Sequence, residues 1–190
     1  MDKEFWDDRW ANQNTGWDMG EVSPPLKAYF DQLKDKELRI LIPGAGNAYE
    51  AEYLHKKGFK NVYVIDISQG AVDSFYERVP DFPAEHIKRG DFFQLTGVFD
   101  LIVEQTFYCA IQPNMRNNYV MQAYNLLKSG GKIIGLLFDF PLESGPPFGG
   151  SYEEYKKRFE NYFNLITLEK SHNSIKPRED REFFFIAQKP

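Results

Sequence analysis

Short apolar runs alternate with amphipathic stretches along most of the chain, and this alternation is typical of an α/β protein. The runs expected to form strands are 40–42, 61–65, 86–88, 99–103 and 132–138, followed by 165–170 and 182–188. The last two flank a charged loop and are expected to pair as an antiparallel hairpin. The pattern therefore predicts a mostly parallel seven-stranded sheet with helices on both faces and an antiparallel C-terminal hairpin.

Helix signals fill the segments between these strands. The expected helices span 24–33, 48–57, 69–78, 114–128 and 151–162. Ser23, Ser68 and Ser151 stand where an N-cap would begin three of them, and Ser129-Gly130-Gly131 is a stop signal for the helix over 114–128. At 190 residues the chain is long enough for one domain with a full core, so residues 1–190 are expected to form a single domain.

The first strand leads into a glycine turn that is the centre of the predicted site. The run 40–42 is followed by Pro43-Gly44-Ala45-Gly46 and then by a helix. Gly44 and Gly46 can take backbone angles that let a ligand lie against the main chain. The second strand delivers Asp66 to the same edge of the sheet, about 20 residues beyond the glycines, where an acid can bind both hydroxyls of a ribose.

Residue types at this turn narrow the choice of ligand. Tyr49 stands where the dinucleotide fingerprint has a third glycine under a pyrophosphate, which argues against NAD and FAD. A nucleoside without phosphates, bound through its ribose and an amino-acid tail, fits better, and S-adenosylmethionine is the common cofactor of that kind. A tight turn without a ligand would use the same glycines, and it is Asp66 that favours a ligand.

Other polar and aromatic residues follow strand ends at the same edge. Asp91 and Phe92 follow the third strand, and Glu104 ends the fourth. Solvated loop acids would give the same pattern, but Phe92 stands where an adenine could stack, so we expect Asp91 to contact the ligand. The loop 145–150, which carries Phe148, is rich in glycine and proline and is either a wall of the pocket or a plain connection.

Residues 1–22 are rich in aromatic side chains. Trp6 and Trp10 are four residues apart and would share one face of a short helix, while Trp17 follows a glycine on a loop. These rings would form either an N-terminal cap that is permanently docked or a lid that closes over the ligand.

Composition limits the partners. The net charge of −5 and the scattered basic residues argue against nucleic acid as a substrate, and the N-terminus lacks the apolar region of a signal peptide. We therefore expect a cytoplasmic protein without a membrane segment, working as a monomer or weak dimer on a small molecule. The three histidines are scattered and give no metal-site spacing. Cys109 is the single cysteine, and a buried core position is favoured over a nucleophile.

Taken together, these motifs resemble the class I S-adenosylmethionine-dependent methyltransferases, and more narrowly the thiopurine S-methyltransferase family, which includes the plant thiol and halide methyltransferases. The resemblance covers nearly the whole chain and rests on segments spread along it: Phe5-Trp6 to Trp10, Thr15-Gly16-Trp17, Ile42-Pro43-Gly44-Ala45-Gly46, Ile65-Asp66-Ile67-Ser68, Gly90-Asp91-Phe92-Phe93, Phe99-Asp100-Leu101-Ile102, Cys109-Ala110-Ile111 with Pro113 and Arg116, and Gly145-Pro146-Pro147-Phe148.

The resemblance implies a Rossmann-like fold and specific roles for individual residues. Cofactor binding is implied for Trp6, Trp10, Trp17, Gly44, Asp66, Asp91 and Phe92, to which the turn adds Gly46. Trp17 and Arg116 are implied on the acceptor side, where Phe148 is added from its loop. The plant members have a Gly-Lys-Glu-Lys-like segment where this chain has Pro177-Arg178-Glu179-Asp180-Arg181, so the acceptor is expected to differ.

The implied reaction is transfer of a methyl group to a small soft nucleophile such as a thiol, thiopurine, hydrosulfide or halide. Positioning supplies most of the rate of such a displacement. Arg116 would hold an anionic acceptor, and Tyr108 or Glu104 could deprotonate a neutral thiol. Two alternatives are an O- or N-methyltransferase, which would need a general base at the acceptor, and a protein that binds S-adenosylmethionine without catalysing a reaction.

Overall fold

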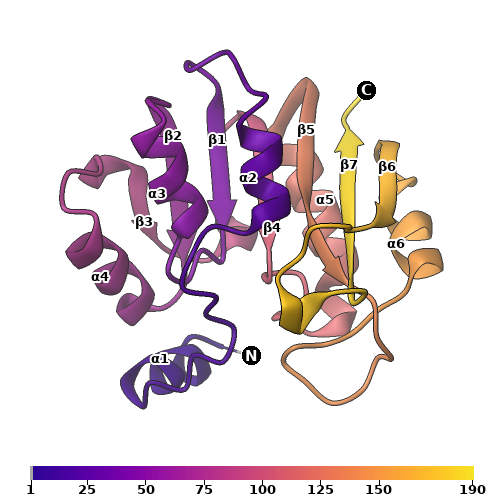
Figure 1. Ribbon diagram of the computed structural model, residues 1–190, viewed down its shortest axis with the longest axis horizontal. Helices are drawn as coiled ribbons and strands as arrows, with labels where there is room; N and C mark the ends of the chain where they lie inside the picture. The colour runs from indigo at the N-terminus through magenta and orange to yellow at the C-terminus, as the bar shows by residue number, and fades with distance from the viewer. Residues whose placement is uncertain (1) are drawn as a thin grey trace.

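The computed structural model describes residues 2–190, in which seven strands form one sheet (Figure 1). The strands are β1 (Arg39–Pro43), β2 (Asn61–Asp66), β3 (Ile87–Arg89), β4 (Phe99–Gln105), β5 (Leu127–Phe138), β6 (Asn164–Lys170) and β7 (Glu182–Gln188). Their order is β3-β2-β1-β4-β5-β7-β6, and only the pairs that involve β7 are antiparallel. The predicted sheet and its C-terminal hairpin are confirmed.

Helices cover both faces of this sheet. They are α1 (Lys3–Ala11), α2 (Pro24–Phe30), α3 (Tyr49–Lys56), α4 (Gln69–Arg78), α5 (Arg116–Leu126) and α6 (Tyr152–Phe159), with single 3₁₀ turns at Ala84–His86, Phe92–Gln94, Pro113–Met115 and Lys176–Arg178. No helix within residues 2–190 is both long and apolar enough to cross a membrane.

Alternate residues of the central strands enter separate cores on the two faces. Ile40 and Ile42 of β1 pack with apolar residues of α2, α3 and α4, whereas Leu41 packs with residues of α5 and α6. Since successive side chains of a strand point to opposite faces, a strand covered on both sides reads as the continuous apolar run seen in the sequence.

The boundary between α5 and β5 differs from the prediction. A helix was expected over 114–128 with the strand beginning at Lys132, but α5 ends at Leu126 and β5 begins at Leu127. Gly130 donates its N–H to the Lys189 carbonyl, and the Lys189 N–H is donated to the Gly131 carbonyl. These bonds to the end of the chain hold Ser129-Gly130-Gly131 in the strand. Long-range pairing therefore moved the boundary between helix and strand away from the position that the local sequence predicted.

Only one of the three predicted serine caps makes a capping hydrogen bond with its side chain. Ser151 accepts a hydrogen bond from the Glu154 N–H and caps α6 as expected. Ser23 and Ser68 hold the N-cap positions of α2 and α4 without a capping bond from their side chains. The Ser68 hydroxyl instead donates to Asp7 of α1, which lies beyond the carboxyl end of β1 and apart from the two helix layers (Figure 1).

Candidate functional site

A cavity of about 730 Å³ opens at the carboxyl ends of the parallel strands, between the sheet and α1. This edge is where open α/β sheets bind their ligands. The cavity is lined by every residue predicted to bind the cofactor: Trp6, Trp10, Trp17, Gly44, Gly46, Asp66, Asp91 and Phe92. The structure therefore brings together in space residues that are spread over the first half of the chain.

The glycine turn after β1 forms the floor of this cavity. Gly44 and Gly46 both have positive φ, of 56° and 52°. A Cβ atom on Gly44 would lie 2.3 Å from the Phe107 ring, so a glycine is required for this contact as well as for the backbone angle. The turn and Phe107 consequently pack without a gap between β1 and the segment after β4.

Asp66 closes the turn from the end of β2. Its Oδ2 accepts the Gly46 N–H at 2.9 Å, and its Oδ1 accepts the Ser68 N–H at 2.9 Å. Burial raises the pKa of the Asp66 carboxyl, while these bonds act in the opposite direction. Each carboxylate oxygen retains a free acceptor site after one backbone bond, so Asp66 can still accept hydrogen bonds from a pair of vicinal hydroxyls.

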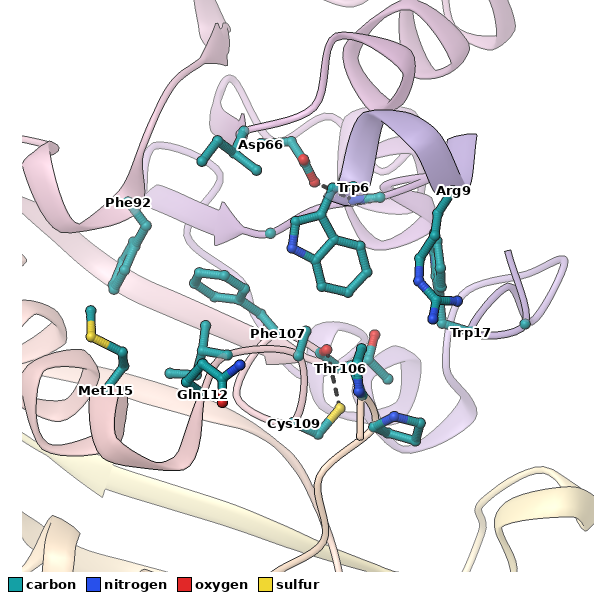
Figure 2. A pocket seen from close by; sticks show the side chains of 18 of the residues that line it. Trp6, Arg9, Trp17, Asp66, Phe92, Thr106, Phe107, Cys109, Gln112 and Met115 are labelled. Atoms are coloured by element: carbon teal, nitrogen blue, oxygen red, sulfur yellow. Dashed lines mark hydrogen bonds between the residues drawn. The ribbon is translucent and has the colours of Figure 1, made fainter. Parts of the chain in front are cut away.

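Asp91 and Phe92 follow β3 and line the cavity, and Phe92 lies on the side opposite Trp17 (Figure 2). Asp91 Oδ1 accepts the Phe93 N–H at 2.9 Å and shapes the 3₁₀ turn that places Phe92. Phe92 is only 3% exposed and meets Phe107 edge to face at 5.4 Å. Most of the Phe92 ring therefore packs in the core, and its remaining surface forms an apolar wall for a flat ligand.

The N-terminal segment covers the cavity through its tryptophans. Trp17 makes edge contacts with Trp6 at 5.5 Å and with Trp10 at 6.0 Å between ring centroids. Trp10 also lies so close to Gly70 of α4 that a Cβ there would come within 2.7 Å of it. Figure 2 shows Trp6 projecting from α1 into the cavity opposite Phe107.

Polar contacts fix α1 to the start of α4. Asp7 Oδ1 accepts the Ser68 hydroxyl at 2.7 Å and the Gln69 N–H at 3.1 Å, while Asp7 Oδ2 pairs with Lys3. The hydrogen bonds from Lys3 and Ser68 hold the pKa of Asp7 below its usual value. No residue of α1 is fully buried, so this segment is attached by a few polar contacts and aromatic edges rather than by a core.

Residues from the second half of the chain form the other side of the cavity. These are Thr106, Phe107, Cys109, Ala110, Ile111, Gln112, Met115, Phe138, Phe140, Pro146, Pro147, Pro177, Arg178 and Arg181. Few of them have a local signal for this role, because nothing in the sequence pattern distinguishes Gln112 or Phe140 from a connecting or core residue. The proline and glycine content of 145–150 was the one local signal for a wall of the pocket, and Pro146 and Pro147 do form part of it.

Arg116 does not reach the cavity and requires a correction. Its side chain is fully buried; Nη1 donates to both Glu154 oxygens at 2.9 and 3.1 Å, and Nη2 donates to the Phe148 and Gly149 carbonyls at 3.2 and 2.9 Å. These contacts hold the loop after β5 in place. The geometry does not support the predicted contact between Arg116 and the acceptor.

Tyr108 and Phe148 also lie outside the lining of the large cavity. Tyr108 is 1% exposed and packs against the Arg116 guanidinium at 4.7 Å, and burial raises the pKa of its hydroxyl well above its usual value. Phe148 is 8% exposed and belongs to the core. A phenol that is buried and hard to ionise is unsuited to proton transfer, so the predicted catalytic role of Tyr108 is not supported either.

Cys109 lies at the boundary between the core and the cavity. Its thiol donates to the Thr106 carbonyl at 3.2 Å, and burial raises the pKa of the thiol far above its usual value. Nucleophilic cysteines have a lowered pKa, which agrees with the interpretation of Cys109 as a structural residue.

The amino-acid sequence of this chain is similar to those of known methyltransferases. A profile of the family described as thiopurine S-methyltransferase matches residues 1–184. The chain belongs to the thiopurine S-methyltransferase family. One relative, a thiopurine S-methyltransferase of Photobacterium profundum, is 28% identical over 99% of this chain and 96% of its own length. Another, the probable thiol methyltransferase 2 of Arabidopsis thaliana, is 30% identical over 93% of this chain and 81% of its own length.

Solved structures support the fold of this methyltransferase. The 1,6-didemethyltoxoflavin-N1-methyltransferase of Burkholderia thailandensis, determined with bound 1,6-didemethyltoxoflavin and S-adenosylhomocysteine, matches 98% of this chain and 86% of its own with a TM-score of 0.79. The sequence identity of 14% limits this likeness to the class I methyltransferase fold. Family and fold agree with the sequence-based expectation of an S-adenosylmethionine-dependent S-methyltransferase.

Proposed function

We propose that this methyltransferase binds S-adenosylmethionine between the glycine turn and the aromatic N-terminal segment, and methylates the sulfur of a small organic thiol held against the segments after β4, β5 and the 3₁₀ turn Lys176–Arg178. The observation that carries this proposal is that Gly44, Gly46 and Asp66 line the same cavity as a second, largely apolar set of residues.

The cofactor side of the cavity matches an adenosyl group with an amino-acid tail. Asp66 would accept hydrogen bonds from both ribose hydroxyls, since each of its oxygens has a free acceptor site. Asp91 and Phe92 would contact the adenine, and the main chain at Gly44 and Gly46 would lie along the tail. Trp6, Trp10 and Trp17 would cover the cofactor and exclude water.

On the acceptor side, the chain's own contribution is placement and dehydration. The bound cofactor supplies a methyl group activated on a sulfonium. Thr106, Phe107 and Ile111 line the wall beside the predicted cofactor position and can fix the approach of a sulfur atom, and a fixed approach is worth several orders of magnitude in rate. Aromatic faces such as Trp17 and Phe107 stabilise a sulfonium through cation–π attraction.

No general base is placed at the acceptor among the cavity residues that the structure describes after residue 100. Glu104 accepts hydrogen bonds from the Phe107 and Tyr108 N–H groups and from the Tyr119 hydroxyl, so its carboxylate is already engaged. This favours an acceptor that ionises by itself near neutral pH, as thiols with low pKa do, over an alcohol or amine that needs a base.

The lining of the acceptor side favours an organic thiol over a halide ion. Phe138, Phe140, Pro146 and Pro147 provide an apolar surface, which suits an aromatic or heteroaromatic ring. Arg178 and Arg181 lie at the same side and would favour an acceptor with negative charge.

The test is methyl transfer to a panel of iodide, hydrosulfide, thiocyanate, thiophenol, 2-mercaptobenzoate and 6-mercaptopurine, followed by mass spectrometry of the products. We expect S-methylated aromatic thiols as the main products and slow turnover of iodide. Exclusive methylation of oxygen or nitrogen in a wider panel would overturn the choice of sulfur. Tight cofactor binding without any turnover would identify a binding protein.

We also propose that this enzyme is a cytoplasmic monomer or weak dimer that does not act on nucleic acid. The net charge of −5 supports the last point, because it repels a phosphate backbone. Light scattering at increasing protein concentration tests the proposed oligomeric state, and a stable tetramer would contradict it.

A further inference from the structure

Arg9 is a cation of α1 that lines the cavity and has no hydrogen-bond or ion-pair partner among residues 2–190. It lies on the same face of α1 as Trp6, three residues away, and both line the cavity. Among residues 2–190, its side chain forms no ion pair and no hydrogen bond, and its Nε is shielded from solvent. Figure 2 shows the Arg9 side chain extending from α1 beside Trp17 at the edge of the cavity.

The other cations that line the cavity have a polar partner or are exposed to water. Lys3 pairs with Asp7 at 2.7 Å, and Arg178 pairs with Glu182 at 3.3 Å and donates to the Trp17 carbonyl at 3.1 Å. Arg181 is exposed and stacks over Phe140 at 5.0 Å, so water can solvate it. Arg9 is the one whose guanidinium has a shielded N–H and no polar partner in the described chain.

A guanidinium in this state is matched to a carboxylate. Its planar fork donates two parallel hydrogen bonds to the two oxygens of a carboxylate, and such bonds are the strong ones. The Arg9 guanidinium is already oriented by the Phe5 ring, whose centroid lies 4.7 Å from Cζ. A shielded N–H without an acceptor destabilises the protein, and a hydrogen bond to a bound carboxylate would remove this penalty.

We propose that Arg9 is the carboxylate-binding residue of the closed site, so that α1 is held over a ligand by its charge as well as by its tryptophans. This inference rests on the proposed function. The carboxylate can come from the amino-acid tail of the cofactor or from an acidic acceptor. Both share the same chemistry, and matched ligands distinguish them.

The first arm of the test measures cofactor binding by calorimetry. S-Adenosylhomocysteine and its decarboxylated analogue differ only in the carboxylate. If the tail is the source, Arg9→Gln weakens binding of S-adenosylhomocysteine by about tenfold or more and leaves the decarboxylated analogue unchanged. Arg9→Lys recovers part of the loss, because it keeps the charge and loses the fork.

The second arm measures turnover of 2-mercaptobenzoate and thiophenol, which differ in one carboxylate. If the acceptor is the source, Arg9→Gln raises KM for 2-mercaptobenzoate by about tenfold and leaves both thiophenol turnover and cofactor affinity unchanged. Arg39→Gln removes the same charge from an exposed arginine outside the cavity and should change none of these values.

A selective loss in either arm supports the proposal and names the source. Equal losses for both members of each pair would show that Arg9 only stabilises the last turn of α1, and no loss in any arm would show that it only fills space; either result overturns the proposal. If the wild-type protein bound no S-adenosylhomocysteine at all, the proposed function itself would fail, which is a distinguishable result.

Discussion

Replacing Arg116 tests whether this residue acts on the loop after β5 or on the acceptor. Arg116→Met keeps much of the side-chain length and removes the guanidinium, which leaves the Phe148 and Gly149 carbonyls and one side of Glu154 without their donors. Breaking a buried ion pair typically costs 3–5 kcal/mol. Glu154 retains Arg158 and is 20% exposed, so we expect the lower part of this range, about 3–4 kcal/mol.

The assay is urea unfolding followed by circular dichroism, with a thermal scan beside it. A loss of about 3–4 kcal/mol corresponds to a decrease in Tm of roughly 6–16 °C for a chain of this length. Arg158→Met is the matched control, because it removes the solvent-side partner of the same Glu154, and it should cost about 1 kcal/mol or less.

Ligand measurements on Arg116→Met separate the two roles. Cofactor affinity should stay close to that of the wild type, since Arg116 does not line the cavity. Any loss of turnover through the loop that carries Pro146 and Pro147 should affect anionic and neutral acceptors alike. Unchanged stability together with a selective loss for anionic acceptors would refute this reasoning and return the guanidinium to the acceptor.

Two further predictions concern Glu104 and the N-terminal segment. Burial raises the pKa of the Glu104 carboxyl to about 7. The folded state therefore binds more protons than the unfolded state between about pH 4.5 and 7. As pH rises through this window, this group lowers the free energy of unfolding by roughly 3 kcal/mol. Because Gln does not titrate, the stability of Glu104→Gln minus that of the wild type should increase from pH 5 to pH 8 in urea unfolding. A difference that is the same at all pH values would exclude the shifted pKa. S-Adenosylhomocysteine should change tryptophan fluorescence and protect residues 5–20 from protease, whereas equally fast digestion with and without it would indicate a static cap.

The sequence predicts those parts of this molecule that depend on local order. The run 40–42, the glycine turn and Asp66 are neighbours in the chain or are separated by one helix, and the βαβ unit places them at one edge in a fixed way. Their convergence on one cavity therefore follows from the sequence pattern alone.

The parts that the sequence did not predict depend on partners far along the chain. Arg116 is bound by Glu154, and Gly130 pairs with Lys189, at separations where no local pattern operates. An arginine after an aromatic segment looks the same whether it faces a ligand or a buried carboxylate. Asp7 and Arg9 gave no signal either, because docking of α1 on α4 decides which charge faces the cavity.

The central claim is that the carboxylate at the end of β2 holds the cofactor, and calorimetric titration of S-adenosylhomocysteine into Asp66→Ala tests it most directly. Asp100→Ala is the control, because Asp100 also accepts a backbone N–H, from Arg39, and lies outside the cavity. With both variants shown to be folded, we predict that Asp66→Ala binds about 1–3 kcal/mol more weakly than the wild type, since two hydroxyls lose a charged acceptor, and that Asp100→Ala binds normally. Wild-type affinity in a folded Asp66→Ala variant would contradict the proposed cofactor site.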